Sequence, residues 1–136
     1  MQTFLPYPSF DESITCLDKR RCWKQVIECD QILSVLLHKT LGWKNHPAVK
    51  QWQNYENALK LYRNICLTHC IIFHKISTQK ELYTIEYVIF PHWLGNQKYH
   101  DSHKSNLLRK DFNFYSKYGW NIQNNLSYFW PSKEDI

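Results

Sequence analysis

Glycine is scarce in this chain, with three residues in 136. Dinucleotide-binding and P-loop folds need glycine-rich turns where the backbone approaches phosphate, so this scarcity argues against both. The sequence also has no HExxH zinc motif and no GxSxG nucleophile elbow. No apolar run approaches the roughly 20 residues that span a membrane, and residues 1–10 lack the basic-then-apolar order of a secretory signal. We therefore expect an intracellular protein, in the cytoplasm or with the nucleoid or nucleus, and no membrane partner.

Cysteine occurs five times, an odd number, and without an export signal, which predicts reduced and buried thiols. Cys66 and Cys70 lie one helical turn apart, and His100 and His103 form a looser pair. Either pair suggests metal ligands, but a structural zinc site needs four ligands and no further paired cluster completes one. For the histidines, contact with phosphate is the favoured interpretation. The sequence therefore predicts no metal site.

The length of 136 residues predicts a single domain over residues 1–136. Apolar residues at positions 22, 26, 29, 33 and 36 recur at spacings of four and three, which predicts a helix over residues 20–39. Pro47 suits the first turn of a second helix over residues 47–75, and the two apolar stripes should pack together. A third helix is expected over residues 97–110. The predicted fold class is mainly α, a compact single-domain helical fold.

The shorter segments carry weaker patterns. Asp11 or Ser13 is expected to cap a short helix that ends at Asp18. Residues 40–46 are predicted to form a loop, with Gly42 stopping the helix before it. Residues 82–90 are rich in β-branched and aromatic side chains and form either a strand or a short helix. The aromatic residues 128–131 should pack on the body. Other aromatic rings either fill the core or lie exposed and stack on bases.

Positive charge is concentrated in two places, and the formal net charge is +5. Residues 19–24 hold four cations and no acid, and residues 98–117 hold five cations against two acids. Each cluster alone would be an ordinary solvated helix face. Two of them favour one phosphate-binding surface, because phosphate contacts need cations more than a fixed spacing. We predict that this surface contains Arg20, Arg21, Lys24, Lys44, Arg109 and Lys110.

Glu28 is the acid whose position best suits a catalytic carboxylate. It lies one helical turn after Lys24 and two turns after Arg21, and nearby positive charge favours an ionised carboxylate. Such a carboxylate can stabilise developing positive charge or move protons once a substrate is bound. The alternative is an ordinary surface ion pair.

Four blocks of sequence resemble a known family. They are residues 1–6 (MQTFLP), 17–25 (LDKRRCWKQ) followed by Glu28, 42–49 (GWKNHPAV) and 103–111 (HKSNLLRKD). Together they are similar, in the same order, to the small bacterial and viral pyrimidine-dimer DNA glycosylases, the endonuclease V-like family. Residues 114–119 (FYSKYG) resemble the aromatic segment near the C-terminus of the phage endonuclease V, which helps to hold the damaged strand.

The resemblance implies a compact helical fold of the phage endonuclease V type, threaded by its own N-terminus. It implies a monomer that acts on damaged double-stranded DNA, as a glycosylase and abasic-site lyase without a cofactor. In this family the α-amine attacks the sugar C1′ and expels the base, and β-elimination from the resulting imine cuts the strand. A glutamate assists, and arginines hold phosphates. An α-amine suits this role because more of it is neutral at neutral pH than of a lysine amine.

Two positions differ from the family pattern. Gln2 is bulky, so Met1 should be retained and supply the amine. The family's Arg-Glu pair aligns with Lys24-Gln25, and because an amide cannot exchange protons as glutamate does, Glu28 would take over from the same face. Otherwise the chain is a noncatalytic DNA- or RNA-binding module on the same fold, or a glycosylase for another modified base.

The predicted site has two groups of residues. The catalytic group is Met1, Glu28 and Gln25, with the Met1 amine close to the Glu28 carboxylate in a cleft bordered by Arg21, Lys24 and His46. The DNA-binding group consists of Arg20, Arg21, Lys24, Lys44, Asn45, His46, His103, Lys104, Arg109 and Lys110.

Overall fold

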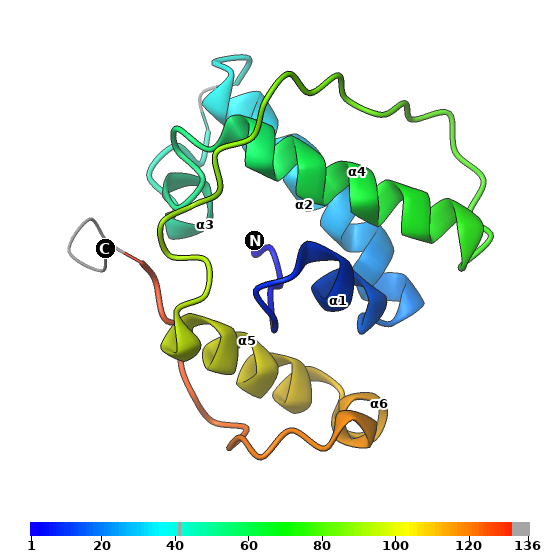
Figure 1. The fold of residues 1–136 in the computed structure, drawn as a ribbon, viewed down its shortest axis with the longest axis vertical. Coiled ribbons are helices and arrows are strands. Elements are labelled where there is room, and N and C mark those ends of the chain that lie inside the picture. Colours follow the sequence, from blue (N-terminus) through cyan, green and yellow to red (C-terminus); the bar gives the residue numbers. More distant parts are fainter. Residues whose placement is uncertain (41, 132–136) are drawn as a thin grey trace.

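The computed structural model describes residues 1–40 and 42–131. The elements in chain order are α1 (Phe10–Thr15), α2 (Lys19–Leu36), α3 (Pro47–Lys50), α4 (Glu56–Ile72), α5 (Gln97–Lys110), α6 (Phe112–Tyr115) and the 3-10 turn η1 (Ser116–Tyr118). No strand occurs in the described ranges, which confirms the mainly α prediction. In Figure 1, α2 and α4 lie on one side of the molecule and α5 on the other.

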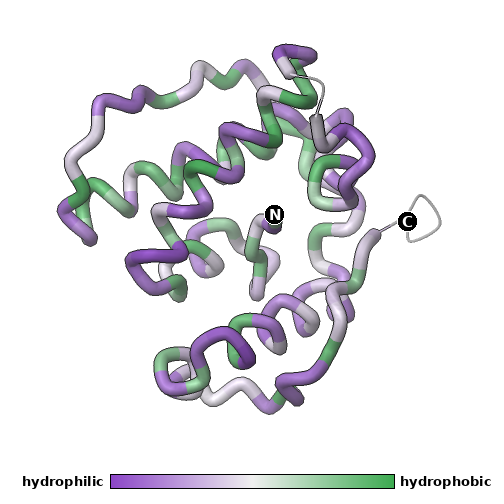
Figure 2. The backbone as a smooth tube through the Cα atoms, turned by 180° about the vertical axis from the view of Figure 1, so that it is seen from behind, coloured by the Kyte–Doolittle hydropathy of each residue, from purple (hydrophilic) through white to green (hydrophobic). Residues whose placement is uncertain are grey.

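Helices α2 and α4 form the centre of the core. The N-terminus of α2 is capped by Asp18, whose carboxylate accepts from the Arg21 N–H. Of the apolar positions expected for α2, residues 22, 26, 29 and 33 are buried and Leu36 is partly buried, and the helix packs on the buried side of α4. Figure 2 shows apolar and polar residues alternating along both helices, as expected when each buries one face. The predicted packing of these two apolar stripes is confirmed.

The expected helix over residues 47–75 is wrong in its length, because it is two helices separated by residues 51–55, and the second ends at Ile72. Asn54 adopts a left-handed backbone conformation with φ 72°, which asparagine tolerates better than most residues. The break buries Trp52, whose Nε1–H donates to Thr3 Oγ1 at 2.9 Å. It also frees the Gln51 carbonyl to accept from Trp93 Nε1–H at 2.9 Å. These contacts with distant segments outweigh the local tendency to continue the helix.

Several boundaries also differ from expectation. Helix α1 is capped by Ser9 rather than Asp11 or Ser13, and it ends at Thr15. Helix α2 ends at Leu36, and the chain turns at His38 with φ 62°, so Gly42 is not the residue that stops it. Residues 82–90 form neither strand nor helix. Residues 97–110 form the predicted helix, and the aromatic residues 128–130 pack against the core as expected.

Residues 73–96 run as a long strap over α4, seen as the green trace in Figure 1. Side chains of α4 hold it by its backbone: Arg63 donates to the Glu81 carbonyl at 2.6 Å, and Asn64 Nδ2 donates to the Tyr83 carbonyl at 2.9 Å. The strap needs no regular structure because helix side chains satisfy its polar groups.

The N-terminal segment crosses the middle of the molecule, between α2 and α5 (Figure 1). The Phe4 N–H donates to Gln25 Oε1 at 2.7 Å, and the Phe4 carbonyl accepts from Tyr62 at 2.7 Å. The Leu5 N–H donates to His103 Nδ1 at 2.8 Å, and the Leu5 carbonyl accepts from His100 Nδ1 at 2.7 Å. Three helices therefore hold this extended segment. None of the described helices combines the length and apolarity of a membrane span.

Candidate active site at the N-terminus

A cavity of about 320 Å³ opens where the N-terminus meets α2. The lining combines residues from the extended N-terminal segment, from one face of α2 and from the end of α5. The lining residues are Met1, Gln2, Phe4, Arg20, Arg21, Lys24, Gln25, Glu28 and Lys110. Positions 21, 24, 25 and 28 share a helix face because they are three or four residues apart. All three residues expected to be catalytic line this cavity, with four of the expected DNA-binding cations.

The carboxylate of Glu28 is bound directly by the N-terminal segment. The backbone N–H of Gln2 donates to Glu28 Oε2 at 2.5 Å. Successive backbone nitrogens lie at most about 3.7 Å apart, so the Met1 nitrogen is within about 6 Å of this oxygen. An amine and a carboxylate at this separation can both contact one substrate carbon and its leaving atoms, directly or through one water.

Both ends of the Gln25 amide are hydrogen-bonded at the base of the cavity. Its Oε1 accepts from the Phe4 N–H at 2.7 Å and, at 2.9 Å, shares the Tyr62 hydroxyl proton with the Phe4 carbonyl, while Nε2 donates to the Gln2 carbonyl at 3.0 Å. The side chain is buried. Gln25 thus fixes the backbone of residues 2–4 and holds the first residue of the chain over α2.

The expected border residue His46 is not among the residues that line this cavity, although the charges of the N-terminus and Glu28 act on its imidazole. His46 is the N-cap of α3, and its Nδ1 accepts from the Ala48 N–H at 3.0 Å, so the ring proton is on Nε2. Burial lowers the pKa of His46, the positive N-terminus of the chain lowers it further, and Glu28 opposes both. Two aromatic rings meet His46 edge-on, Trp43 at 5.8 Å and Trp130 at 6.2 Å between centroids.

The cations of the cavity differ in how strongly they are held. Arg21 pairs with Asp18 at 3.1 Å. Burial opposes the ionisation of Asp18, but hydrogen bonds from Tyr115 and Arg21 outweigh it and lower the pKa of this carboxyl. Arg20, Lys24 and Lys110 are exposed around the rim. The rim therefore offers one oriented guanidinium and three exposed cations, a combination suited to an anionic polymer.

A family model described as pyrimidine dimer DNA glycosylase matches residues 1–71. The chain belongs to the pyrimidine dimer DNA glycosylase family. The matched residues contain the N-terminal segment, helices α1 to α3 and nearly all of α4, and so include Met1, Gln25 and Glu28. No curated protein and no solved structure matches the chain.

In this family member, several other residues expected to bind DNA do not line the cavity. Lys44 and Asn45 line a separate hollow beside the end of α2. Lys104 lies over the ring of Tyr7, with Nζ 5.1 Å from its centroid. Arg109 donates to the carbonyls of Asn124 and Leu126, so it holds the C-terminal segment.

His103 lies in the core rather than at the surface. Its side chain is fully buried, and burial and the neighbouring His100 lower its pKa to about 3. Its Nδ1 holds the Leu5 N–H. A neutral, enclosed imidazole cannot contact phosphate while the fold is intact, so the structure gives His103 a supporting role. His100 is likewise buried, between the Leu5 carbonyl and the Gly95 N–H.

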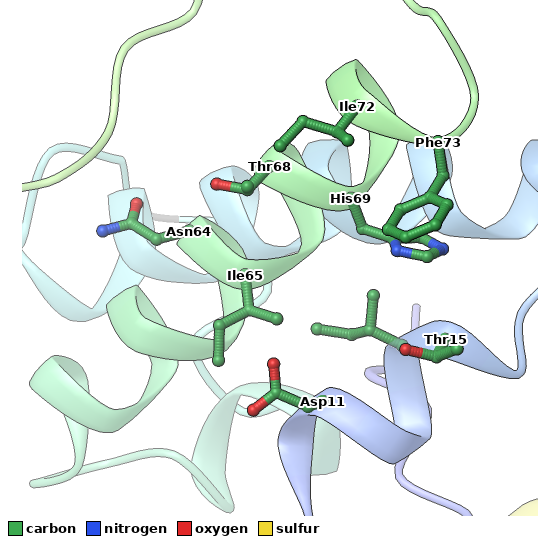
Figure 3. A pocket seen from close by; sticks show the side chains of 9 residues that line it. Asp11, Thr15, Asn64, Ile65, Thr68, His69, Ile72 and Phe73 are labelled. Carbon is green, nitrogen blue, oxygen red and sulfur yellow. The ribbon is translucent and has the colours of Figure 1, made fainter.

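A second cavity of about 320 Å³ lies between α1 and α4 and is drawn in Figure 3. Its walls are formed by Asp11, Ile14, Thr15, Asn64, Ile65, Thr68, His69, Ile72 and Phe73. Figure 3 shows His69 and Phe73 side by side at one end and Asp11 at the other. No lysine or arginine lines it, so its chemistry does not suit a phosphate backbone.

Sequence reasoning missed two features of the site and one of the core. Gln2 supplies the backbone donor to Glu28, and Tyr62 supports Gln25 from α4. Neither has a local sequence signal, because both contacts join segments at least 26 residues apart. In the core, Cys22 meets Cys66 and Cys70. The burial of Cys22 was readable from the helical stripe, but its partners depend on how α2 packs on α4.

Proposed function

We propose that this family member is a DNA glycosylase with abasic-site lyase activity on damaged pyrimidines in double-stranded DNA, and that the amine of Met1 is its nucleophile. The observation that carries the proposal is the hydrogen bond from the Gln2 N–H to Glu28, which keeps the start of the chain and a carboxylate in one cation-rimmed cavity. The cavity is complete within one chain, which supports action as a monomer.

The proposed reaction begins with the neutral amine of Met1 attacking C1′ of the damaged nucleotide. As the N–C1′ bond forms, the glycosidic bond breaks, and its electron pair leaves with the base, which is protonated. The amine then loses a proton, and opening of the sugar ring gives a protonated imine. Glu28, within about 6 Å of the amine, accepts the proton and stabilises the positive charge. Removal of a C2′ proton expels the 3′ phosphate, and water releases the enzyme.

The residues around this pair have separate roles in the proposal. Arg20, Arg21, Lys24 and Lys110 bind phosphates beside the extruded nucleotide, since their cations border the cavity. The Nε2–H of His46 is free to donate to the displaced base or a phosphate, because Nδ1 is already used. Trp43 is 64% exposed beside His46 and provides a surface on which a base can stack.

Gln25 is a positioning residue in this scheme, because both ends of its amide hold other groups. A glutamate at this position would place a carboxylate against the Gln2 carbonyl, where the amide of Gln25 now donates a hydrogen bond. In this proposal Gln25 therefore only holds the backbone, and Glu28 transfers the proton. The presence of glutamine also motivates the alternative function, a noncatalytic nucleic-acid-binding module on the same fold. A glycosylase for a different modified base would use the same groups with another lesion.

Borohydride trapping on an oligonucleotide with one abasic site tests the proposal. A lyase that forms an imine is reduced to a stable covalent adduct, and the adduct should form with one chain per DNA. A matched variant with one extra residue before Met1 should lose the adduct while still binding the DNA. Binding without any adduct would favour the noncatalytic module. Duplexes with single pyrimidine dimers or other damaged bases would then identify the lesion by base release.

A further inference from the structure

Three cysteine thiols from two helices meet in the core, on the side of α2 that faces away from the Met1 cavity. Cys22 comes from the first turn of α2, and Cys66 and Cys70 are one turn apart on α4. Their sulfurs all lie within 4.8 Å of one another, with 3.6 Å between Cys22 and Cys66 and 3.3 Å between Cys22 and Cys70. All three side chains are fully buried, and none is in a disulfide.

The spacing of these sulfurs matches a tetrahedral thiolate site. Zinc binds thiolate at about 2.3 Å, so two sulfurs on one tetrahedral zinc ion lie about 3.8 Å apart. The separations of 3.6 and 3.3 Å in two of the pairs are shorter than this value by up to about half an ångström. A disulfide needs only two sulfurs at about 2.05 Å, so it leaves the third thiol without a reason to converge.

A candidate for the fourth ligand, His74, follows α4, although its ring nitrogens do not lie within 4.8 Å of all three sulfurs. After α4 the chain turns back at Lys75, with φ 55°, and the Ile76 N–H donates to the Cys70 carbonyl at 3.1 Å. His74 follows Cys70 by four residues, and its ring packs edge-on against His69 with 5.1 Å between the ring centroids. The Nε2 atom of His74 is buried and has no hydrogen-bond partner among the described residues. A buried ring nitrogen without a partner costs free energy that a metal bond would offset.

We propose that Cys22, Cys66 and Cys70, with His74 as the fourth ligand, bind one thiophilic divalent cation, zinc being the expected ion. Binding releases the thiol protons to solvent, as metal binding by cysteine requires. The ion joins α2 to α4 and so fixes the helix whose opposite face carries Lys24 and Glu28. Its role is structural, and it is independent of whether the Met1 cavity is catalytic.

Cobalt substitution of the reduced full-length protein is the direct test. Four-coordinate cobalt with thiolate ligands gives intense visible bands and a sulfur charge-transfer band in the near ultraviolet, which bare protein lacks. We expect saturation at one Co²⁺ per chain, loss of the bands on adding one equivalent of Zn²⁺, and one zinc per chain by elemental analysis of protein grown with zinc. Absence of both bands and zinc would overturn the proposal. Equally, a mass two units lower before reduction, with no metal, would identify a disulfide instead.

Matched variants locate the site. Cys70→Ser should abolish the cobalt bands or weaken cobalt binding at least 100-fold, whereas Cys29→Ser, an equally buried thiol outside the cluster, should leave them intact. Because either variant can destabilise the core, circular dichroism accompanies each measurement. His74→Ala should weaken cobalt binding at least 10-fold and shift the visible bands, and His38→Ala, at an exposed histidine away from the cluster, is its control. Unchanged binding by His74→Ala would remove His74 from the site.

Discussion

The backbone N–H of Gln2 donates to Oε2 of Glu28 at 2.5 Å, and this contact positions the first residues of the chain on α2. The carboxylate belongs to a helix and the donor to an extended segment, so their meeting depends on the clamp that Gln25 places on residues 2–4. The first amine of the chain is therefore held over a cationic helix face rather than left in solvent. This arrangement depends in turn on His103, a buried histidine that holds the Leu5 N–H.

Glu28→Gln should lower the rate of strand cleavage by about 10²- to 10⁴-fold, the usual contribution of a group that transfers protons. The amide oxygen of glutamine can still accept from the Gln2 N–H, so the fold and the DNA affinity should be retained. Single-turnover cleavage of an abasic-site duplex and a gel-shift assay measure the two quantities. Glu12→Gln, at an exposed position on α1, is the control. Full cleavage by the Glu28 variant would remove this carboxylate from the mechanism.

The exposed rim cations should act on DNA through phosphate. Arg20→Gln, Lys24→Gln and Lys110→Gln should each weaken binding about equally for damaged and undamaged duplexes. Each should also reduce the slope of log affinity against log salt by about one, because one fewer counterion is released. Fluorescence anisotropy across a salt series measures this slope. Lys39→Gln changes an exposed lysine outside the cavity and should leave it unaltered. Unchanged slopes for all three rim variants would mean that DNA binds elsewhere.

Gln25→Glu should destabilise the fold without increasing cleavage. The change removes the Nε2 donor and sets a carboxylate against the Gln2 carbonyl in a buried site. We expect the free energy of unfolding to fall by about 2–4 kcal/mol, the range for an uncompensated buried polar or charged group. Urea unfolding at pH 7 measures it, with Gln31→Glu on the exposed face of α2 as control. A stable variant that cleaves faster would instead place proton transfer at position 25.

Stability should fall as the pH is lowered from 7 to 5, in part because of His103. Burial lowers its pKa to about 3 in the folded protein, below the ordinary value of 6.5. Between these values the unfolded chain binds more protons than the folded chain, so acid favours unfolding. This one residue should remove about 2 kcal/mol between pH 7 and pH 5.

His103→Asn provides the comparison for this prediction, since its amide oxygen can replace Nδ1 as the acceptor for the Leu5 N–H. Urea unfolding at both pH values should show a smaller loss for this variant than for the parent chain. His38→Asn, at an exposed histidine, should keep the parent's full loss. Equal losses in all three proteins would mean that His103 is not the group that titrates.

Local patterns determined much of this protein. The apolar stripe of α2 and the helix at residues 97–110 follow from spacing, because a helix repeats its contacts every three to four residues. The same geometry places positions 21, 24, 25 and 28 on one face before any tertiary contact is known. The reduced, buried cysteines also follow from composition.

Tertiary structure alone decided which of these elements meet. Leu5 is bound by His103, 98 residues away, and this contact buries a histidine that the sequence placed among phosphate ligands. The break before α4 exists because Trp52 and the Gln51 carbonyl find partners in distant segments. Cys22 reaches Cys66 and Cys70 only because α2 packs on α4. Such contacts have no sequence period, because they arise from the crossing of separate segments whose local conformations do not encode one another.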